Sequence, residues 1–184
     1  LQHKNTFCSY ADTIMPHFFF AVGFAYRLTF LRRLGKQAAR TTYWQAIRRN
    51  LGLILIGLVV YGLDPEYDSW AGMKQAGLKG FLLTSFESLP WQALVHIGLT
   101  GLWVLPVIAR GMGIRLVFVF VCAVAHIIVL HGGYYEWAFR AHTIDGGPLG
   151  FLTWSIPMLI GSIAYDLVAT RSPRMAIKPI LLWA

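Results

Sequence analysis

The sequence contains few charged residues and few cysteines, and both shortages narrow the class of protein. Charged residues make up 13% of its 184 positions, whereas about 25% is usual in soluble globular domains. Hydrophobic residues reach 57% and aromatic residues 15%, which excludes a disordered, solvated chain. The two cysteines, Cys8 and Cys122, cannot form a disulfide framework. This composition predicts an integral membrane protein.

Nucleotide-binding loops are also absent. Neither G-x-x-x-x-G-K-[ST] nor G-x-G-x-x-G occurs in the sequence, so P-loop and Rossmann sites are excluded. The 16 basic residues outnumber the 8 acidic ones, but they lie between apolar segments, which favours a topology signal over nucleic-acid binding. The chain has no signal-peptide pattern and starts at Leu1 in a polar stretch. We therefore expect a fragment of a longer protein.

Five apolar windows are long enough to cross a bilayer as helices. A hydrocarbon core about 30 Å thick needs about 20 mostly apolar helical residues. Windows of this size cover residues 13–31, 44–63, 91–109, 113–131 and 149–170. We predict one all-α integral membrane domain over residues 1–184, with about five transmembrane helices in this chain, as part of a larger helical bundle.

Charges alternate between the two ends of these windows. Basic residues favour the cytoplasmic face of a membrane, while acidic residues matter little. One end carries eleven basic residues and no acidic one: Arg32, Arg33, Lys36, Arg40, Arg48, Arg49, Arg110, Arg115, Arg171, Arg174 and Lys178. The other end carries four basic and seven acidic residues: Lys4, Lys74, Lys79, Arg140, Asp12, Asp64, Glu66, Asp68, Glu87, Glu136 and Asp145. The first end is predicted to be cytoplasmic, which puts residues 1–12 on the non-cytoplasmic side.

The two remaining charges, Arg27 and Asp166, fall inside the first and fifth windows. Charges inside a membrane are costly and usually face a partner or a water-filled cavity. Both lie near the cytoplasmic end of their windows, so one interpretation is an ion pair or the polar lining of a cytoplasmic vestibule. In the other interpretation, Arg27 extends to the lipid headgroups and Asp166 marks the end of its helix.

The predicted orientation places all six histidines toward the outer side. His96 and His126 fall in the outer halves of the third and fourth windows. A single histidine at such a position often does no more than bond the backbone. Six on one side favour a functional role for some of them.

Three segments match the pattern of a known family. His3 to Phe7, followed by Tyr10 to Gly23 with its Ala-Asp-x-x-x-Pro and Phe-rich stretch, resembles the catalytic segment of the heparan-alpha-glucosaminide N-acetyltransferase family. Weaker matches follow in the family's order at Val95 to Gly98 and at Asp145 to Thr153. The sequence differs in that His96 stands where the family has arginine. The family's opening Asp-x-x-Arg-Gly helix has no counterpart, as expected of a fragment without the first helix.

This resemblance implies an enzyme. Members take acetyl-CoA from the cytosolic side and acetylate an amino sugar on the far side, with an outer-loop histidine as the active residue. That role falls to His3, whose imidazole can act as a base or accept the acetyl group. Asn5 then donates to the developing oxyanion. Asp12 either orients the imidazole or caps the first helix.

Basic residues on the cytoplasmic end are candidates for binding acetyl-CoA, the expected co-substrate. Arginines bind phosphates through charge-assisted hydrogen bonds, although the topology signal alone explains them equally well. The candidate acetyl-CoA residues are Arg27, Arg32, Arg33, Arg48 and Asp166. No metal site is expected.

Two other functions fit the same residues. A transporter or proton-coupled carrier would use Arg27, Asp166 and the histidines as a relay. A membrane haem protein would use His96 and His126 as axial ligands. For the acyltransferase, the expected partners are the lipid bilayer, acetyl-CoA and a sugar or glycan acceptor, with a homo-oligomer also possible. The expected location is a bacterial inner membrane, or a lysosomal-type membrane in a eukaryote.

Overall fold

The computed structural model describes residues 10–62, 74, 75, 77, 91–140 and 145–170, and this part of the chain is all helical. The main helices are α1 (Tyr10–Leu34), α2 (Ala39–Gly62), α4 (Ala93–Ile108), α5 (Met112–Val129), α6 (Tyr135–Arg140) and α7 (Phe151–Thr170). The segment Leu130–Tyr134 links α5 to α6 with a kink at Gly133, whose φ is 90°, and a 3-10 turn (Gly147–Leu149) precedes α7. The five long helices coincide with the five predicted windows. Helix α1 and the start of α2 extend past their windows, where polar residues continue the helix, whereas α4 and α7 are slightly shorter than theirs.

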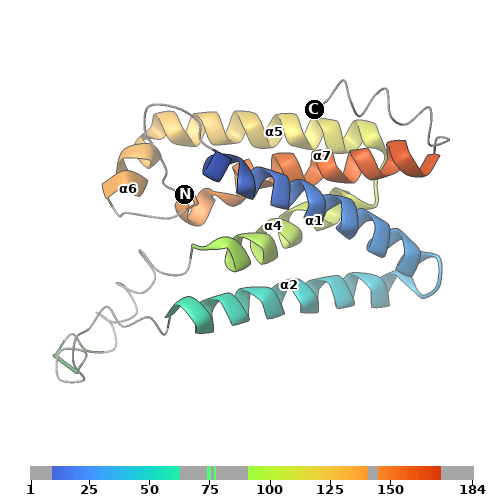
Figure 1. Ribbon diagram of the computed structural model, residues 1–184, viewed down its shortest axis with the longest axis horizontal. Helices are drawn as coiled ribbons and strands as arrows, with labels where there is room; N and C mark the ends of the chain where they lie inside the picture. The colour runs from blue at the N-terminus through green and yellow to red at the C-terminus, as the bar shows by residue number, and fades with distance from the viewer. Residues whose placement is uncertain (1–9, 63–73, 76, 78–90, 141–144, 171–184) are drawn as a thin grey trace.

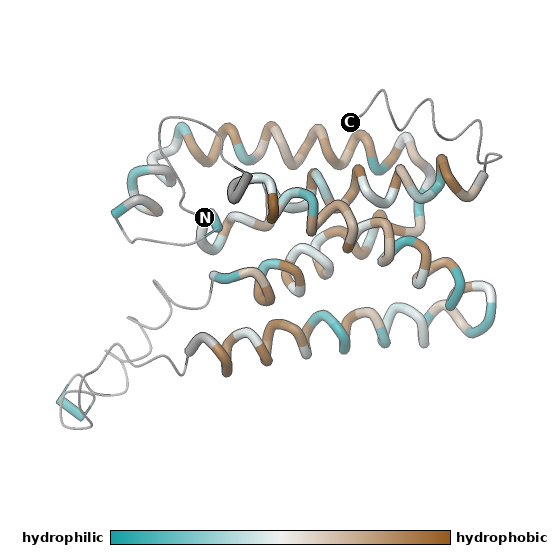
Figure 2. The backbone as a smooth tube through the Cα atoms, in the orientation of Figure 1, coloured by the Kyte–Doolittle hydropathy of each residue, from teal (hydrophilic) through white to brown (hydrophobic). Residues whose placement is uncertain are grey.

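Three of these helical segments are long and apolar enough to cross a membrane: Thr13–Leu34, Met112–Tyr134 and Gly147–Ala169. Helix α4 is apolar but has only 16 residues, and the first half of α2 is polar. Figure 2 shows that change along α2, which is mainly brown at one end and mainly teal and white toward the α1–α2 turn. The count of five spans therefore stays a prediction.

Large apolar side chains cover the outside of α5. Phe120 is 69% exposed, Ile128 65% and Val117 64%. Soluble proteins seldom leave so many large apolar residues of one helix in water. A hydrocarbon environment removes this cost, so the exposed surface supports a membrane protein as strongly as the composition does.

Helix α7 lies between α1 and α5, and α2 lies on the opposite side of the bundle from α5 (Figure 1). Near the start of both helices, Phe19 of α1 stacks on Trp154 of α7 with ring centroids 5.1 Å apart. Farther along both, Arg27 pairs with Asp166. These contacts show that α1 and α7 run in the same direction, as the predicted alternation of spans requires.

The neighbouring helices run the opposite way. On α5, Arg115 bonds Ser162 near the end of α7, whereas His126 lies against Thr153 near its start. On α2, the site of Gly57 faces Val95 near the start of α4. The basic ends of α1, α2, α4 and α5 consequently gather at one end of the bundle, beside the last turns of α7.

Glycines let α1 and α7 touch at their crossing point. A Cβ atom on Gly23 would overlap the backbone carbonyl of Met158, and one on Gly161 would overlap that of Phe20. Small residues at helix interfaces allow this close approach in membrane bundles. Gly23 closes the matched segment of α1, so its place in the sequence has a direct packing reason.

A buried polar contact joins α1, α2 and α4. Asn50 Nδ2 donates to the Tyr26 hydroxyl at 3.2 Å, and that hydroxyl donates to the Gly101 carbonyl at 3.3 Å. A Cβ on Gly101 would lie 2.7 Å from Asn50 Oδ1, so glycine makes room for the amide. Buried polar groups need such partners, and here they fix how α2 sits on the other two helices.

Thiol labelling tests which end of this bundle faces outward. Cys8 lies outside the described residues and is predicted to be on the outer side. Cys122 is 1% exposed, and its Sγ accepts from Trp103 Nε1 at 3.3 Å. A membrane-impermeant thiol reagent should label Cys8 in intact cells and leave Cys122 unmodified until the protein is unfolded. The Cys8→Ser variant is the control, and labelling of Cys8 only after permeabilisation would reverse the orientation.

Candidate functional site

An ion cluster lies inside the basic end of the bundle, where α1, α5 and α7 meet. Arg27 Nε and Nη2 donate to the two carboxylate oxygens of Asp166 at 3.0 and 3.1 Å. Its Nη1 donates to the carbonyl oxygen of Ile108 at the end of α4. The predicted pairing of Arg27 with Asp166 is therefore confirmed, and the fork geometry is the one a guanidinium makes best. With 7% of its surface exposed, Arg27 does not extend to the headgroups.

Arg115 is a third member of this ion cluster. The sequence predicts only that Arg115 lies among the basic residues of the cytoplasmic end. Its side chain is 0% exposed and also donates to Asp166. Arg115 Nη1 donates to the Ser162 hydroxyl at 2.8 Å, and that hydroxyl donates to the Leu159 carbonyl at 2.6 Å. Its position inside the window 113–131 was a signal that it could be buried. Two arginines thus share one carboxylate, which leaves a net positive charge inside the bundle.

The start of α7 forms a second polar site, at the opposite end of the bundle. The Tyr134 hydroxyl donates to the Gly146 carbonyl at 2.8 Å and accepts from the Leu149 amide at 2.9 Å. Trp154 Nε1 donates to the Asp145 carbonyl at 2.9 Å. Asp145 has a positive φ of 56°, a conformation that costs a non-glycine residue energy. These bonds hold the segment that leads into α7 in one shape.

Two histidines lie against this segment from different helices. A ring nitrogen of His126 on α5 lies 3.0 Å from the Thr153 hydroxyl. His96 on α4 is 0% exposed, and its Cε1 would lie 2.8 Å from a Cβ on Gly150. The His96 ring packs against Trp91, with ring centroids 6.3 Å apart, and the backbone of Trp91 lies within reach of the imidazole. An imidazole in such surroundings can exchange a proton with a group that comes to it.

The other predicted site residues are placed as follows. His3 and Asn5 lie outside the described residues. Asp12 is the third residue of α1, which begins at Tyr10. Arg32 and Arg33 in the last turn of α1 are exposed, as is Arg48 on α2. The structure brings Arg27 and Asp166 together, and it leaves these three arginines facing away from the core.

The same positions hold the candidate ligands for a metal ion or a haem. Within the described ranges, no three His, Cys, Asp or Glu side chains are grouped so as to hold a metal ion. His96 and His126 both lie beside the start of α7, but His126 already has Thr153 as a partner. The haem hypothesis requires His126 to give up that contact.

No family model, curated protein or solved structure matches this chain.

Proposed function

We propose that the chain is the core of a membrane-embedded acyltransferase, which moves an acetyl group from acetyl-CoA to an amino sugar or related glycan on the outer or lumenal face. The observation that carries the proposal is the meeting of the three matched segments at one end of the bundle. Phe19 of the first segment stacks on Trp154 beside the third, and His96 of the second lies against Gly150 of the third. Segments that serve one reaction need such proximity, although they lie far apart in the sequence.

The two polar sites suit a reaction whose substrates come from opposite sides. Acetyl-CoA carries several phosphates, and the exposed Arg32, Arg33 and Arg48 supply donors for them at the basic end. Arg27 and Asp166 already satisfy each other. Their proposed contribution to acetyl-CoA binding is to hold α1, α5 and α7 in place around the ligand.

A carrier function is the second candidate, and the buried cluster is the observation that favours it. Asp166 between Arg27 and Arg115 is the kind of intramembrane charge arrangement that marks ion and proton pathways. A carrier would move its substrate across the membrane without consuming acetyl-CoA.

One assay separates the two functions. Membranes containing the full-length protein are given labelled acetyl-CoA and glucosamine, and acetylated glucosamine and free CoA are measured together. The acyltransferase proposal expects equal amounts of both products, and membranes that lack the protein are the control. Uptake of glucosamine into sealed vesicles with no release of CoA would instead establish the carrier.

A further inference from the structure

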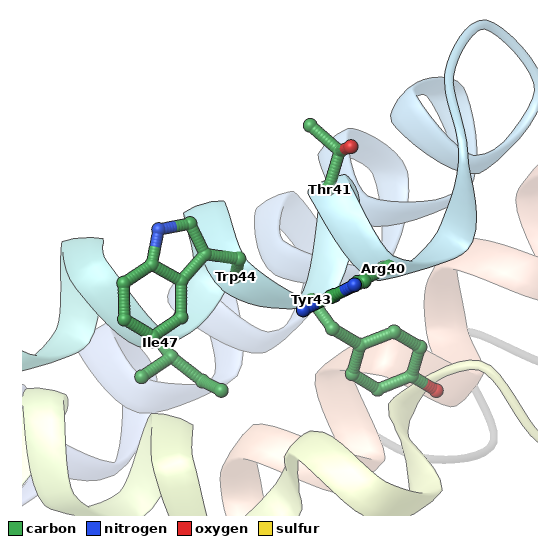
Figure 3. Close-up of a pocket in the computed structure, with 5 residues that line it drawn as sticks. All are labelled: Arg40, Thr41, Tyr43, Trp44 and Ile47. Carbon is green, nitrogen blue, oxygen red and sulfur yellow. The ribbon is translucent and has the colours of Figure 1, made fainter.

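A hollow lies on the first two turns of α2, at the basic end of the bundle. It has a volume of about 660 Å³ and is lined by Arg40, Thr41, Tyr43, Trp44 and Ile47. Figure 3 shows these side chains on α2, where Trp44 follows Arg40 by one turn and Ile47 follows Tyr43 by one turn. We call these five residues the α2 hollow.

The α2 hollow is built from one fixed and one accessible aromatic ring. Tyr43 packs edge-on against Phe30 of α1, with ring centroids 5.0 Å apart, which holds one wall in place. Trp44 is 63% exposed. Tryptophan at the border between apolar and polar surroundings is typical of side chains at the membrane interface.

The charge at the α2 hollow is positive and has no counter-charge among the described residues. Arg40 lines the hollow and Arg48 follows one turn beyond Trp44, and both are exposed. The described ion pairs use the carboxylates of Asp166 and Glu136, and neither involves these two arginines. The hollow is therefore complementary to an anionic group.

An apolar stripe continues from the α2 hollow along the same face of the helix. Trp44, Arg48, Leu51, Leu55 and Leu58 follow one another at spacings of three or four residues, which places them one above another. Leu51, Leu55 and Leu58 are 50%, 63% and 41% exposed. From residue 51 to residue 60 the helix rises about 14 Å, close to one leaflet of a core about 30 Å thick. The stripe is long enough for one lipid tail.

We propose that the α2 hollow binds the headgroup of an anionic phospholipid, whose acyl chain lies along Leu51, Leu55 and Leu58. Arg40 contacts the phosphate, and Trp44 lies at the level of the glycerol backbone. A soluble phosphate compound would use the arginines but not the stripe, whereas a zwitterionic lipid would use the stripe but gain less from the arginines. The two features together select a lipid with net negative charge.

Native mass spectrometry of the full-length protein tests this site. The protein is purified in mixed micelles that contain equal amounts of phosphatidylglycerol and phosphatidylcholine, and the lipids retained per protein are counted. We expect phosphatidylglycerol to be retained in preference. Arg40→Gln should lower its retention about five-fold, the factor that one basic residue near an anionic surface supplies. Trp44→Ala should lower the retention of the lipid further, and Trp44→Phe should restore most of it.

Arg110→Gln is the matched control, because Arg110 is exposed at the same end but lies in the α4–α5 turn away from the hollow. Equal retention of the two lipids, or equal losses in Arg110→Gln and Arg40→Gln, would overturn the proposal. So would displacement of phosphatidylglycerol by millimolar glycerol phosphate, which would identify a soluble phosphate ligand. A change from dimer to monomer in Trp44→Ala with lipid retention unchanged would make the surface an interface between copies. Circular dichroism of each variant establishes that it is folded.

Discussion

Replacement of His3 by alanine should lower acetyl transfer to glucosamine by about 100-fold or more, the contribution of a general base, while acetyl-CoA still binds. Imidazole has a pKa of about 6.5 and is largely neutral at pH 7. It can take a proton from the amine as the amine attacks the thioester carbonyl and CoA leaves. Alternatively its nitrogen attacks that carbonyl, releases CoA and passes the acetyl group to the amine. Neither route involves the proposed acetyl-CoA contacts at the opposite end of the bundle.

The measurement uses the full-length protein in membranes, with labelled acetyl-CoA for both transfer and binding. His17→Ala is the control, because His17 also lies near the start of α1 but is exposed, and its Nδ1 lies 2.5 Å from the Thr13 carbonyl oxygen of its own helix. Its variant should transfer at nearly the wild-type rate. Wild-type transfer by His3→Ala would exclude the proposed role of His3, even if the protein proves to be an acyltransferase.

The helices could be predicted from the sequence because each apolar window has the length that a bilayer demands. Their alternating direction could be predicted as well, since the charges change ends with every window. The Arg27–Asp166 pair followed from two opposite charges at similar depth. These features depend only on how deep a residue lies along the membrane normal. Position along each apolar window determines that depth.

Lateral arrangement was much harder to predict. Helix α5 carries Arg115, Cys122 and His126 on one face, at spacings of seven and four residues, but that face alone does not identify which helices pack against it. Arg115 lies on that side and is buried, although its place near the end of a window fits an exposed loop residue equally well. The prediction that His96 and His126 lie toward the same end of the bundle is confirmed. Their partners Thr153 and Gly150 depend on which helices are neighbours, and only the folded structure determines that.

Replacement of Asp166 by asparagine should destabilise the protein strongly, by about 3–5 kcal/mol, the usual cost of removing one partner from a buried ion pair. The amide has nearly the shape of the carboxylate, so packing is retained while the charge is lost. Arg27 and Arg115 then face each other with no counter-charge. Thermal unfolding in detergent, followed by the loss of monodisperse protein, measures the effect.

Adding Arg27→Gln to this variant should recover part of the lost stability, because it removes one of the two uncompensated charges. The gain appears as a coupling energy in a double-mutant cycle, and additive losses would show that Arg27 and Asp166 are not energetic partners. An exchange of the two charges is a poorer test, since an arginine at position 166 would meet Arg115.

Glu136→Gln is the matched control. Glu136 also pairs with an arginine, Arg140, at 3.5 Å, but both side chains are at least 75% exposed, and exposed pairs contribute little to stability. The unfolding temperature of Glu136→Gln should therefore stay at the wild-type value. Water can solvate Arg140 when its partner is lost, whereas it cannot reach the arginines of the buried cluster.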